Sequence, residues 1–298
     1  MKRIFHFCIL LYKIICGYIY KLFLDLGLLR IPSLNYAFKR TPNVVVSLTS
    51  YGRRVSSCVV YYTIVSILRQ KIQPDRIIIW ISEEEWNHNL IPKRIFALRN
   101  KGVEIRSCKD YKSYKKLIPA LQLCKDDIII TIDDDIIYSK DTISSFLKYH
   151  KLFPNQILCY CSSIPIEDHG VPHYYDKWEL VDRELSKIVL FPIGYGAILY
   201  PPGSLHKDVL DIEKFEALCP NADDIWFWFN STRINIIKTN IHKNGIDFSF
   251  DMLYQHFHKG AALTHMNRME NSNDLQFKKL FEYYNVRLNV DEDKLQNY

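Results

Sequence analysis

Three adjacent carboxylates follow a strongly apolar stretch within residues 126–139, which read DDIIITIDDDIIYS. Three acids this close repel one another unless a cation or hydrogen-bond donors lie between them. In an extended chain Asp133 and Asp135 point to the same side, so together they can bind one hard divalent ion. Asp134 points to the other side, where it can meet a ligand hydroxyl or a backbone amide. The cluster therefore indicates either a metal site or an acidic turn that caps a strand.

A second acidic centre lies in residues 219–229, which read CPNADDIWFWF. Asp223 and Asp224 fall in the first turn of a predicted helix, where the helix dipole stabilises carboxylates. One acid at this position is explained by capping alone. A pair of acids beside Trp226 and Trp228 also suits base catalysis, next to aromatic faces on which a sugar ring can stack. A capped core helix and a catalytic base therefore both remain open on this stretch alone.

The apolar stretches between these polar groups indicate an α/β fold with a mostly parallel sheet flanked by helices. The run before Asp133 lacks apolar–polar alternation, which is typical of a central strand covered on both faces. Strands and helices alternate through the first half of the chain, and this rhythm implies parallel strands joined by right-handed crossovers. The predicted strands are residues 44–48, 76–81, 103–106 and 128–132, and the predicted helices are residues 55–70, 93–100 and 142–149.

Polar segments follow three of these strands, at the edge of the sheet where open α/β folds bind their ligands. Residues 49–54 (TSYGRR) follow the first strand, and Ser82 with three glutamates follows the second. Residues 109–117 (KDYKSYKKL) carry four lysines, a composition usually found on a solvated face. At this edge of the sheet the same lysines are also placed to reach a diphosphate.

The second half of the chain is less regular. Gly194 and Gly196 are two residues apart, but the third glycine and the helix of a dinucleotide-binding motif are missing. We expect these glycines to allow close approach of the backbone to a sugar ring. The other predicted elements are strands at residues 157–164 and 234–239, an irregular stretch over the site at residues 165–188, a helix at residues 271–284 and a loose tail at residues 291–298.

Residues 1–30 are apolar but interrupted by charges, so no uncharged run is long enough to span a bilayer. Arranged as a helix, the segment gathers its polar and basic residues on one face, and the rest of its surface is apolar or aromatic. This amphipathic pattern fits an in-plane membrane helix, or a helix packed on the domain's own surface. The wide apolar face and the basic polar face favour the membrane surface. No small-x-small cleavage site follows, so a signal peptide is not expected.

The composition of the 298-residue chain indicates a globular protein with one catalytic domain. Its 39 Lys and Arg against 33 Asp and Glu give a net charge of +6, too modest for a nucleic-acid-binding surface. Phosphorylated small molecules or an anionic membrane surface suit this charge better. Eight cysteines are scattered without a C-x-x-C pair, which favours free thiols in a reducing compartment. We expect a cytoplasmic protein at the inner face of the cell membrane.

Taken in order, these motifs resemble those of GT-A glycosyltransferases. The chain is most similar to family-2-like bacterial enzymes that assemble capsule, O-antigen and other surface polysaccharides. The resemblance covers about residues 43–285 and leaves the N-terminal helix outside it. We therefore expect a transferase domain at residues 41–290, preceded by the amphipathic, membrane-surface helix at residues 1–40 and followed by a loose tail at residues 291–298. The motifs that carry it are TSYGRR, WISEEE, SYKKLIPAL, TIDDDIIY, GYGAILYPPGSL and ADDIWFWF.

The resemblance implies roles for individual residues. The acidic cluster matches the DXD motif, in which Asp133 contacts the ribose or the metal and Asp135 binds a divalent ion on the donor diphosphate. Asp224, or its neighbour Asp223, matches the acid that is the general base in inverting members. His256 is a candidate to complete the metal site, although lone histidines more often make structural hydrogen bonds. The residues implied in binding the nucleotide or the diphosphate are Thr49, Tyr51, Arg53, Glu83, Asp110, Lys115, Lys116, Asp133 and Asp134.

The sequence therefore predicts a metal-dependent glycosyltransferase. We expect it to use Mn²⁺ or Mg²⁺ and to move a sugar from a nucleoside-diphosphate sugar, a UDP-sugar, to a hydroxyl of a glycan or lipid-linked acceptor, with inversion. Two alternatives remain: a protein of the same fold that binds nucleotide sugars without transferring them, and a sugar nucleotidyltransferase. The second alternative would carry a glycine-rich phosphate loop after the first strand, and TSYGRR has a single glycine.

Overall fold

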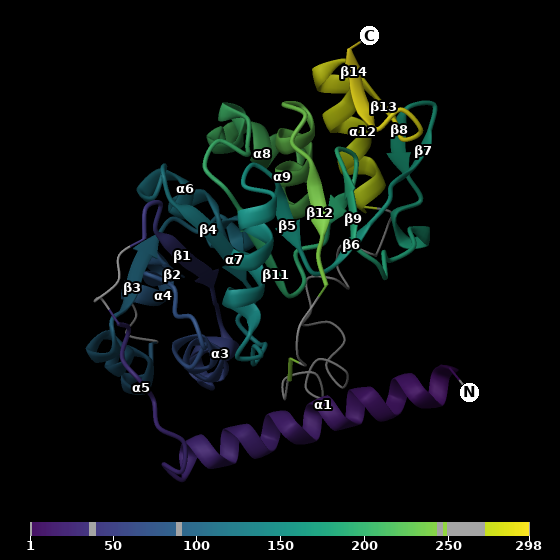
Figure 1. The fold of residues 1–298 in the computed structure, drawn as a ribbon. Coiled ribbons are helices and arrows are strands. Elements are labelled where there is room, and N and C mark those ends of the chain that lie inside the picture. The colour runs from purple at the N-terminus through teal and green to yellow at the C-terminus, as the bar shows by residue number, and fades with distance from the viewer. Residues whose placement is uncertain (1, 36–39, 88–90, 243–246, 249–271, 298) are drawn as a thin grey trace. The chain divides into compact units, whose positions relative to one another are not determined.

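The computed structural model describes residues 2–35, 40–87, 91–242, 247–248 and 272–297 (Figure 1). The chain divides into two compact units, and each unit consists of three separate segments of the sequence. Unit 1 comprises Met1–Asp110, Asp133–Leu147 and Lys243–Ala262, and unit 2 comprises Tyr111–Ile132, Lys148–His242 and Leu263–Tyr298.

Unit 1 is built on three parallel strands: β1 (Val44–Thr49), β2 (Arg76–Ser82) and β3 (Val103–Cys108). Their order is β3-β2-β1, and they lie where the sequence predicts strands. β1 and β2 are almost entirely buried because their residues are mostly apolar and β-branched. The crossover between them carries α3 (Val59–Leu68), in which all ten residues are buried. The predicted parallel β-α-β arrangement is confirmed for these strands.

The helix expected at residues 55–70 is divided into two, α2 (Arg53–Ser56) and α3. Cys58 lies between them with a φ of 58°, in the left-handed region, and this conformation interrupts the helix. Besides the N-terminal helix described below, the helices that lie in or begin in the described part of unit 1 include α4 (Glu83–Asn87), α5 (Lys93–Phe96), the 3-10 helix η1 (Ala97–Lys101) and α7 (Thr142–Leu152).

Buried polar side chains on and just after α3 hold the segment that contains the acidic cluster. Thr63 Oγ1 donates to the carbonyl oxygen of Asp134 at 3.0 Å, and Ser66 Oγ accepts from the backbone N–H of Tyr138 at 3.0 Å. Gln70 Nε2 donates to the carbonyl oxygen of Ser139 at 2.6 Å. Because buried polar groups are costly without partners, these bonds fix the backbone of the acidic cluster against α3.

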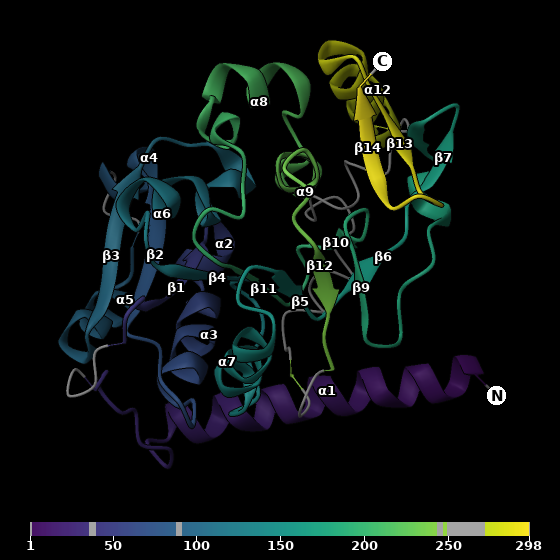
Figure 2. The ribbon, with the colours of Figure 1, turned by 45° about the horizontal axis from the view of Figure 1, so that its top comes forward.

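Unit 2 contains a mixed sheet of five strands (Figure 2). The strands are β4 (Ile128–Ile132), β5 (Ile157–Cys159), β9 (Leu185–Lys187), β11 (Ala197–Tyr200) and β12 (Lys238–Asn240). β11 runs antiparallel to both β4 and β5, whereas β12 runs parallel to β5 and antiparallel to β9. β4 is buried along its whole length, as predicted for the strand before Asp133. With three strands in unit 1 and five here, flanked by helices, the described chain confirms the α/β class.

The core of unit 2 is aromatic. Trp226 and Trp228 are 0% and 2% exposed, and their indole N–H groups donate to the carbonyl oxygens of Val209 and Val189 at 3.1 Å each. Both tryptophans are therefore structural, and the prediction that a sugar stacks on them is wrong. The helices of this unit are η2 (Lys112–Lys116), α6 (Ile118–Leu123), η3 (Tyr175–Lys177), η4 (Lys207–Leu210), α8 (Ile212–Leu218), α9 (Asp223–Thr232) and α12 (Ser272–Tyr284).

Two segments expected to lack structure are ordered. Residues 165–188 include a β-hairpin, η3 and β9, and the expected loose tail forms one strand of a second hairpin. The second hairpin is stable because Val286 and Leu288 are buried, and because Asp293 accepts from the backbone N–H groups of Ile188 and Val189 at 2.9 Å each. The short strands are β6 (Ser162–Ser163) with β10 (Phe191–Pro192), β7 (Ile166–Asp168) with β8 (Val171–His173), and β13 (Val286–Asn289) with β14 (Lys294–Asn297).

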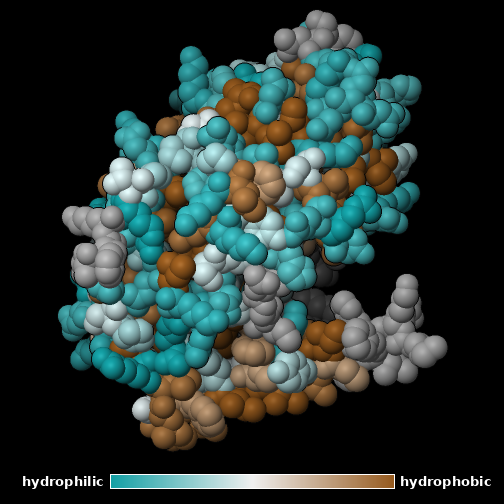
Figure 3. Space-filling model, in the orientation of Figure 1, coloured by the Kyte–Doolittle hydropathy of each residue, from teal (hydrophilic) through white to brown (hydrophobic). Residues whose placement is uncertain are grey.

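The amphipathic helix α1 (Lys2–Asp25) turns part of its polar side toward the rest of unit 1. Gly17 is buried, and Lys21 and Asp25 on the same side make polar contacts with α3 and its surroundings. Apolar side chains cover the outward side, which appears as brown residues along the helix in Figure 3. These exposed residues are Ile9, Leu10, Leu11, Tyr12, Ile15, Tyr18, Ile19, Leu22 and Phe23. Within the described ranges, no helix is both long enough and apolar enough to cross a membrane.

Asp25 anchors the C-terminal end of α1. Its carboxylate accepts from Tyr62 Oη at 2.7 Å and pairs with Arg94 Nη2 at 2.7 Å and Lys21 Nζ at 2.6 Å. Burial pushes the pKa of Asp25 upward, but hydrogen bonds from these three residues outweigh burial and lower the pKa to about 2. The ionised carboxylate therefore stabilises the fold above its ordinary pKa of 3.8, and this contribution is lost as the pH falls toward 2.

We predict that Asp25→Ala lowers the free energy of unfolding by about 1–2 kcal/mol, because it removes several partly exposed charge-assisted hydrogen bonds at once. Chemical denaturation measures the loss, and hydrogen exchange of the α1 amides reports whether the helix end detaches. Glu282→Ala is the control, since it removes only the exposed 3.9 Å pair with Lys278. Equal losses in the two variants would contradict the anchoring role.

Candidate functional site

The first candidate centre is the acidic cluster that follows β4. Asp134 is only 4% exposed, and it accepts a hydrogen bond from Ser50 Oγ at 2.5 Å. Arg54 Nη1 lies 2.6 Å from the other oxygen of Asp134, and Arg54 Nη2 lies 2.8 Å from Asp135 Oδ2. One guanidinium group therefore joins two of the three carboxylates. The cation that this cluster needs is supplied, in this structure, by the chain itself.

Asp134 has a structural position in this centre. Burial is the main reason that the pKa of Asp134 rises to about 6, and the neighbouring charge of Asp135 adds to the rise. Arg54 and the hydrogen bond from Ser50 oppose both effects. Asp134 was expected to face a ligand hydroxyl, but its two carboxylate oxygens are instead engaged inside unit 1. We correct its assignment from ligand binding to the support of Arg54 and Asp135.

Asp133 and Asp135 keep the donor chemistry that a hard divalent cation requires. Both residues are partly exposed, and both offer carboxylate oxygens. Mg²⁺ is commonly held by one or two carboxylates together with substrate phosphates, rather than by a full set of protein ligands. The described residues contain no group of three or more Asp, Glu, His or Cys arranged around a metal position. His256, the proposed further ligand, lies outside the described residues.

The loop after β1 lies beside the acidic cluster. Tyr51 is 44% exposed, and burial of its hydroxyl is the main reason that the pKa of Tyr51 is raised. Arg54 lowers this pKa, while the charges of Asp134, Asp135 and Asp110 raise it. Tyr51 and Asp110 therefore share one electrostatic environment with the cluster, as expected for residues at neighbouring strand ends.

The other nucleotide-binding candidates of unit 1 occupy varied positions. Thr49 Oγ1 donates to the carbonyl oxygen of Trp80 at 2.9 Å, so its hydroxyl helps to join β1 to β2. Arg53 begins α2, and Glu83 is exposed at the start of α4. Glu85, which the sequence did not single out, accepts from the backbone N–H of Gly52 and ties this loop to the end of β2.

The second candidate centre lies in unit 2, where α9 begins. Lys116 Nζ lies 2.9 Å from Asp223 Oδ2 and 3.7 Å from Asp224 Oδ1. The backbone N–H of Gly194 donates to Asp224 Oδ2 at 2.9 Å. Asp224 Oδ1 is buried and accepts no hydrogen bond from any residue that the structure describes. One oxygen of this carboxylate is thus held by Gly194, and the other is enclosed beside Lys116 Nζ at 3.7 Å.

The pKa of Asp224 is raised to about 6. Burial is the main cause, and the negative charge of Asp223 adds to it. Lys116 and the hydrogen bond from Gly194 favour the ionised form and limit the rise. A carboxylate in this state is ionised at neutral pH, yet it binds a proton more readily than an ordinary aspartate.

Gly194 has no side chain because none would fit. A Cβ atom at this position would overlap Asp224 Oδ1 and would lie 2.8 Å from Lys116 Nζ. The backbone at Gly194 therefore lies close to a carboxylate and an ammonium group of the same chain, and the expected approach to a sugar ring stays a prediction. Gly196, in contrast, has open space around it and a φ of +94°, so it is required for backbone conformation alone.

The lysine-rich segment is attached to the turn before α9. Lys112 Nζ donates to Asn221 Oδ1 at 2.8 Å, and Tyr114 Oη donates to the carbonyl oxygen of Cys219 at 2.5 Å. Lys115 is only 2% exposed, so it does not face solvent. Lys116 is the lysine of this segment that reaches the acid pair. The sequence placed both lysines near a diphosphate, whereas the structure places Lys116 beside two carboxylates.

The sequence did not reveal three important contacts of these centres: the Arg54 bridge, the Glu85 bond and the Gly194 contact with Asp224. The TSYGRR segment contains two adjacent arginines, and we selected Arg53. The sequence does contain a reason to expect Arg54 beside the acidic cluster. The requirement for a cation between adjacent acids is a sequence-level argument, and it could have been applied to both arginines.

No family model matches this sequence, and no curated protein matches it. Among solved structures, TarS 1-349 of S. aureus shares 13% identity at a TM-score of 0.44, covering 81% of this chain and 72% of that one. CMP:2-keto-3-deoxy-manno-octonic acid synthetase complexed with CTP shares 10% identity at a TM-score of 0.43, covering 76% of this chain and 99% of that one. The mannosyltransferase PcManGT from Pyrobaculum calidifontis, in complex with GDP-Man and Mn²⁺, shares 12% identity at a TM-score of 0.33, covering 49% of this chain and 42% of that one. At TM-scores this low, the likenesses carry no conclusion about the activity of this chain.

We predict that Gly194→Ala disrupts the second centre more than it disrupts folding. The added methyl group displaces Asp224 or Lys116, and a displacement of about 1 Å in such a group costs about 10²-fold in turnover. Gly196→Ala is the matched control: it strains the backbone by roughly 1–2 kcal/mol and does not touch Asp224. Turnover and thermal melting are measured for both variants. A Gly194→Ala protein with normal turnover would show that the contact has no functional role.

Proposed function

We propose that the chain is a metal-dependent glycosyltransferase. It moves a sugar from a nucleoside-diphosphate sugar, a UDP-sugar, to a hydroxyl of a glycan or lipid-linked acceptor, with inversion, in the biosynthesis of a surface polysaccharide. The order of motifs along the sequence supports this proposal. The observation that carries it is the state of Asp224, a carboxylate with a 23% exposed side chain and a pKa raised to about 6, held by the backbone N–H of Gly194 beside Lys116.

Asp224 has the properties of a general base for this reaction. An acceptor hydroxyl must lose its proton as its oxygen attacks the anomeric carbon of the donor, and a positioned base takes that proton. Gly194 holds the carboxylate through Asp224 Oδ2 and so fixes the orientation of the group that receives the proton. Lys116, at 3.7 Å, favours the ionised form before the reaction. Asp223 pairs with Lys116 at 2.9 Å and thereby holds the lysine in place.

The donor side of the proposal rests on unit 1. Asp133 and Asp135 would hold Mn²⁺ or Mg²⁺, which neutralises the leaving diphosphate when bound. Arg54 and Asp134 hold Asp135 in position from the protein side. The exposed ring of Tyr51 is suited to stack on the base of the nucleotide. We assign the remaining donor contacts to the polar residues at the same strand ends, which are Thr49, Arg53, Glu83 and Asp110.

We further propose that α1 places the protein on the inner face of the cell membrane. Its anchored side carries Lys21 and Asp25, and its outward side is lined by exposed apolar and aromatic residues. A helix with its apolar side outward fits the boundary between lipid headgroups and acyl chains, where such residues are buried without spanning the bilayer. This attachment also suits a lipid-linked acceptor.

The direct test of the proposed activity is a panel of nucleotide sugars incubated with the full-length protein, Mn²⁺ and candidate acceptors, with released nucleoside diphosphate as the readout. We predict that Asp135→Ala abolishes metal-dependent donor binding, because it removes a metal ligand.

Asp224→Asn should keep donor binding and lose about 10²–10⁴-fold in turnover, because an amide cannot accept the proton. Normal turnover in Asp224→Asn would transfer the role of base to another group, with Asp223 as the first candidate.

The pH profile of the wild-type protein provides a second readout of the same prediction. Asp224 must be ionised to act as a base, so turnover should rise as the pH passes through about 6 and then level off. The contribution of Asp224 to stability changes with pH in the opposite direction to turnover. The folded form binds a proton that the unfolded chain has already released, so this group's contribution to stability falls as the pH rises from 3.8 to about 6. A turnover profile that is flat through this range would argue against Asp224 as the base.

We predict that deletion of residues 1–30 releases the protein from anionic lipid vesicles. Co-sedimentation of the full-length and shortened proteins measures this release. Leu22→Glu with Phe23→Glu is the matched variant, since it keeps the helix and places charges on two exposed apolar positions, 52% and 43% exposed. Both changes should reduce the bound fraction. Unchanged sedimentation of the two variants would reject the attachment.

A further inference from the structure

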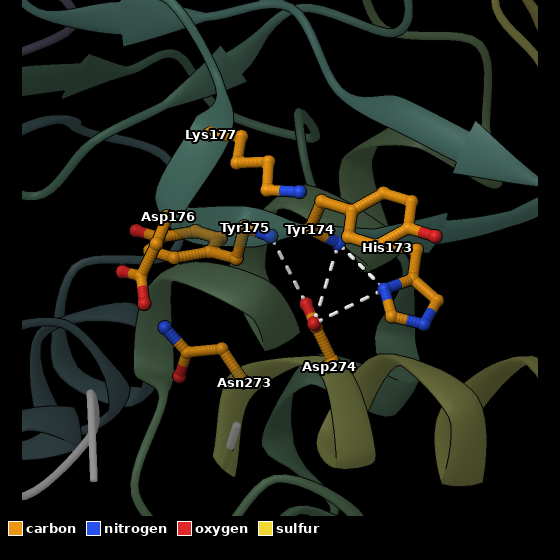
Figure 4. A pocket seen from close by; sticks show the side chains of 7 residues that line it. All are labelled: His173, Tyr174, Tyr175, Asp176, Lys177, Asn273 and Asp274. Carbon is orange, nitrogen blue, oxygen red and sulfur yellow. Dashed lines mark hydrogen bonds and ion pairs between the residues drawn. The ribbon is translucent and has the colours of Figure 1, made fainter. Parts of the chain in front are cut away.

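A pocket of about 250 Å³ lies in unit 2, outside the groups described above (Figure 4). It is lined by residues 173–177, around η3, and by Asn273 and Asp274 in the first turn of α12. Sites for drug-sized ligands begin at about 300 Å³. The volume of this pocket therefore suits one small ring.

The walls of the pocket are held by specific bonds. Asp274 accepts from the backbone N–H groups of Tyr174 and Tyr175 at 3.2 and 3.1 Å, and it lies 3.2 Å from His173 Nδ1. Trp178 Nε1 donates to the carbonyl oxygen of His173 at 2.8 Å and closes the loop. Tyr174 has a φ of 55°, an uncommon conformation that persists only where the surroundings determine it. The shape of the pocket is therefore built into the fold.

A hydrogen bond connects the pocket to the turn that carries the acid pair. Gln276 is three residues after Asn273, so both lie on the same side of α12. Gln276 Oε1 accepts from the backbone N–H of Asn221 at 3.1 Å. Asn221 is two residues before Asp223 and three before Asp224. The pocket and the proposed base are consequently attached to the same short turn within unit 2.

Aromatic packing beneath the pocket makes this connection rigid. The ring centroids of Trp178 and Phe277 are 5.4 Å apart, and those of Phe277 and Trp228 are 5.7 Å apart. Trp228 belongs to α9, whose first two residues are the acid pair. Aromatic pairs at these separations attract one another, so the floor of the pocket is continuous with the helix that positions Asp224.

The groups that face the pocket can bind hydroxyls. Figure 4 shows Asp176 and Asn273 on one side of the pocket and Lys177 with the ring of Tyr174 on the other. Asn273 is 9% exposed, and its Oδ1 atom is buried without a hydrogen-bond donor among the described residues. This oxygen is shielded from the pocket, whereas the amide nitrogen of Asn273 is turned toward Asp176 in Figure 4, where it can donate to a ligand hydroxyl. The carboxylates of Asp176 and Asp274 disfavour a phosphate, so the pocket suits a neutral polyhydroxyl ring.

We infer that this pocket binds one sugar ring of the acceptor glycan. The assignment of the ring to the acceptor rests on the proposed function, whereas the binding of a sugar does not. A hydroxyl of the ring donates to Asp176, and the amide nitrogen of Asn273 and the ammonium group of Lys177 donate to hydroxyl oxygens. The ring of Tyr174 is 44% exposed and covers the apolar face of the sugar.

Saturation-transfer NMR on the full-length protein tests this inference. N-acetylglucosamine, galactose and rhamnose are added separately, without nucleotide donor or metal. At least one of them should bind, and Asn273→Ala and Lys177→Ala should each weaken binding about tenfold, the effect of one lost hydrogen bond in such a site. In the transfer assay, an acceptor that carries the bound sugar should show an increase of similar size in its KM.

Lys278→Ala is the control, because this residue is exposed on α12 and does not line the pocket. Thermal melting establishes whether Asn273→Ala is folded; where it is not, Lys177→Ala at the exposed rim decides the result. Binding of none of the three sugars to the wild-type protein, or unchanged binding in the folded pocket variants, overturns the inference. Sugar binding in a protein that shows no transfer with any donor would reject the proposed activity and keep the pocket.

Discussion

Repulsion between neighbouring carboxylates is the constraint on which both candidate centres depend. Each centre answers it with one cation from the same unit: Arg54 joins Asp134 to Asp135, and Lys116 lies beside Asp223 and Asp224. The residual cost appears in the raised pKa values of Asp134 and Asp224, where burial outweighs the nearby positive charge. The two centres differ in how far their carboxylates are exposed. The side chain of Asp134 is 5% exposed, whereas that of Asp224 is 23% exposed.

The sequence predicts the regular parts of the fold well, because burial leaves little choice for a continuous β-branched run. The strands before Thr49, Ser82 and Asp133 lie where these runs occur. Errors arise where one residue decides the outcome. Cys58, in the left-handed region, divides a helix that its apolar spacing predicts to be continuous. Asp293, by accepting two backbone N–H groups from a distant segment, gives structure to a tail that looks loose on composition alone.

The chemistry of the candidate centres is partly predictable from residue types and their spacing in the sequence. The two acid groups are visible as types and spacings, and Asp224 has the environment expected of a base. Which side chains lie next to them is not visible, since Ser50, Arg54 and Gly194 are 84, 80 and 30 residues distant from the acids that they contact. Trp226 and Trp228 illustrate the opposite failure. Their types suggested a platform for a ligand, but their indole N–H groups are bonded inside the core.

The outward-facing apolar side of α1 has a practical consequence for work with the isolated protein. In water, without lipid, the exposed apolar side chains of α1 between Ile9 and Phe23 face solvent or another molecule, and a patch of this kind promotes association. Two copies can cover it by placing their helices together. The apparent mass of a purified sample should therefore depend on its concentration and on added detergent.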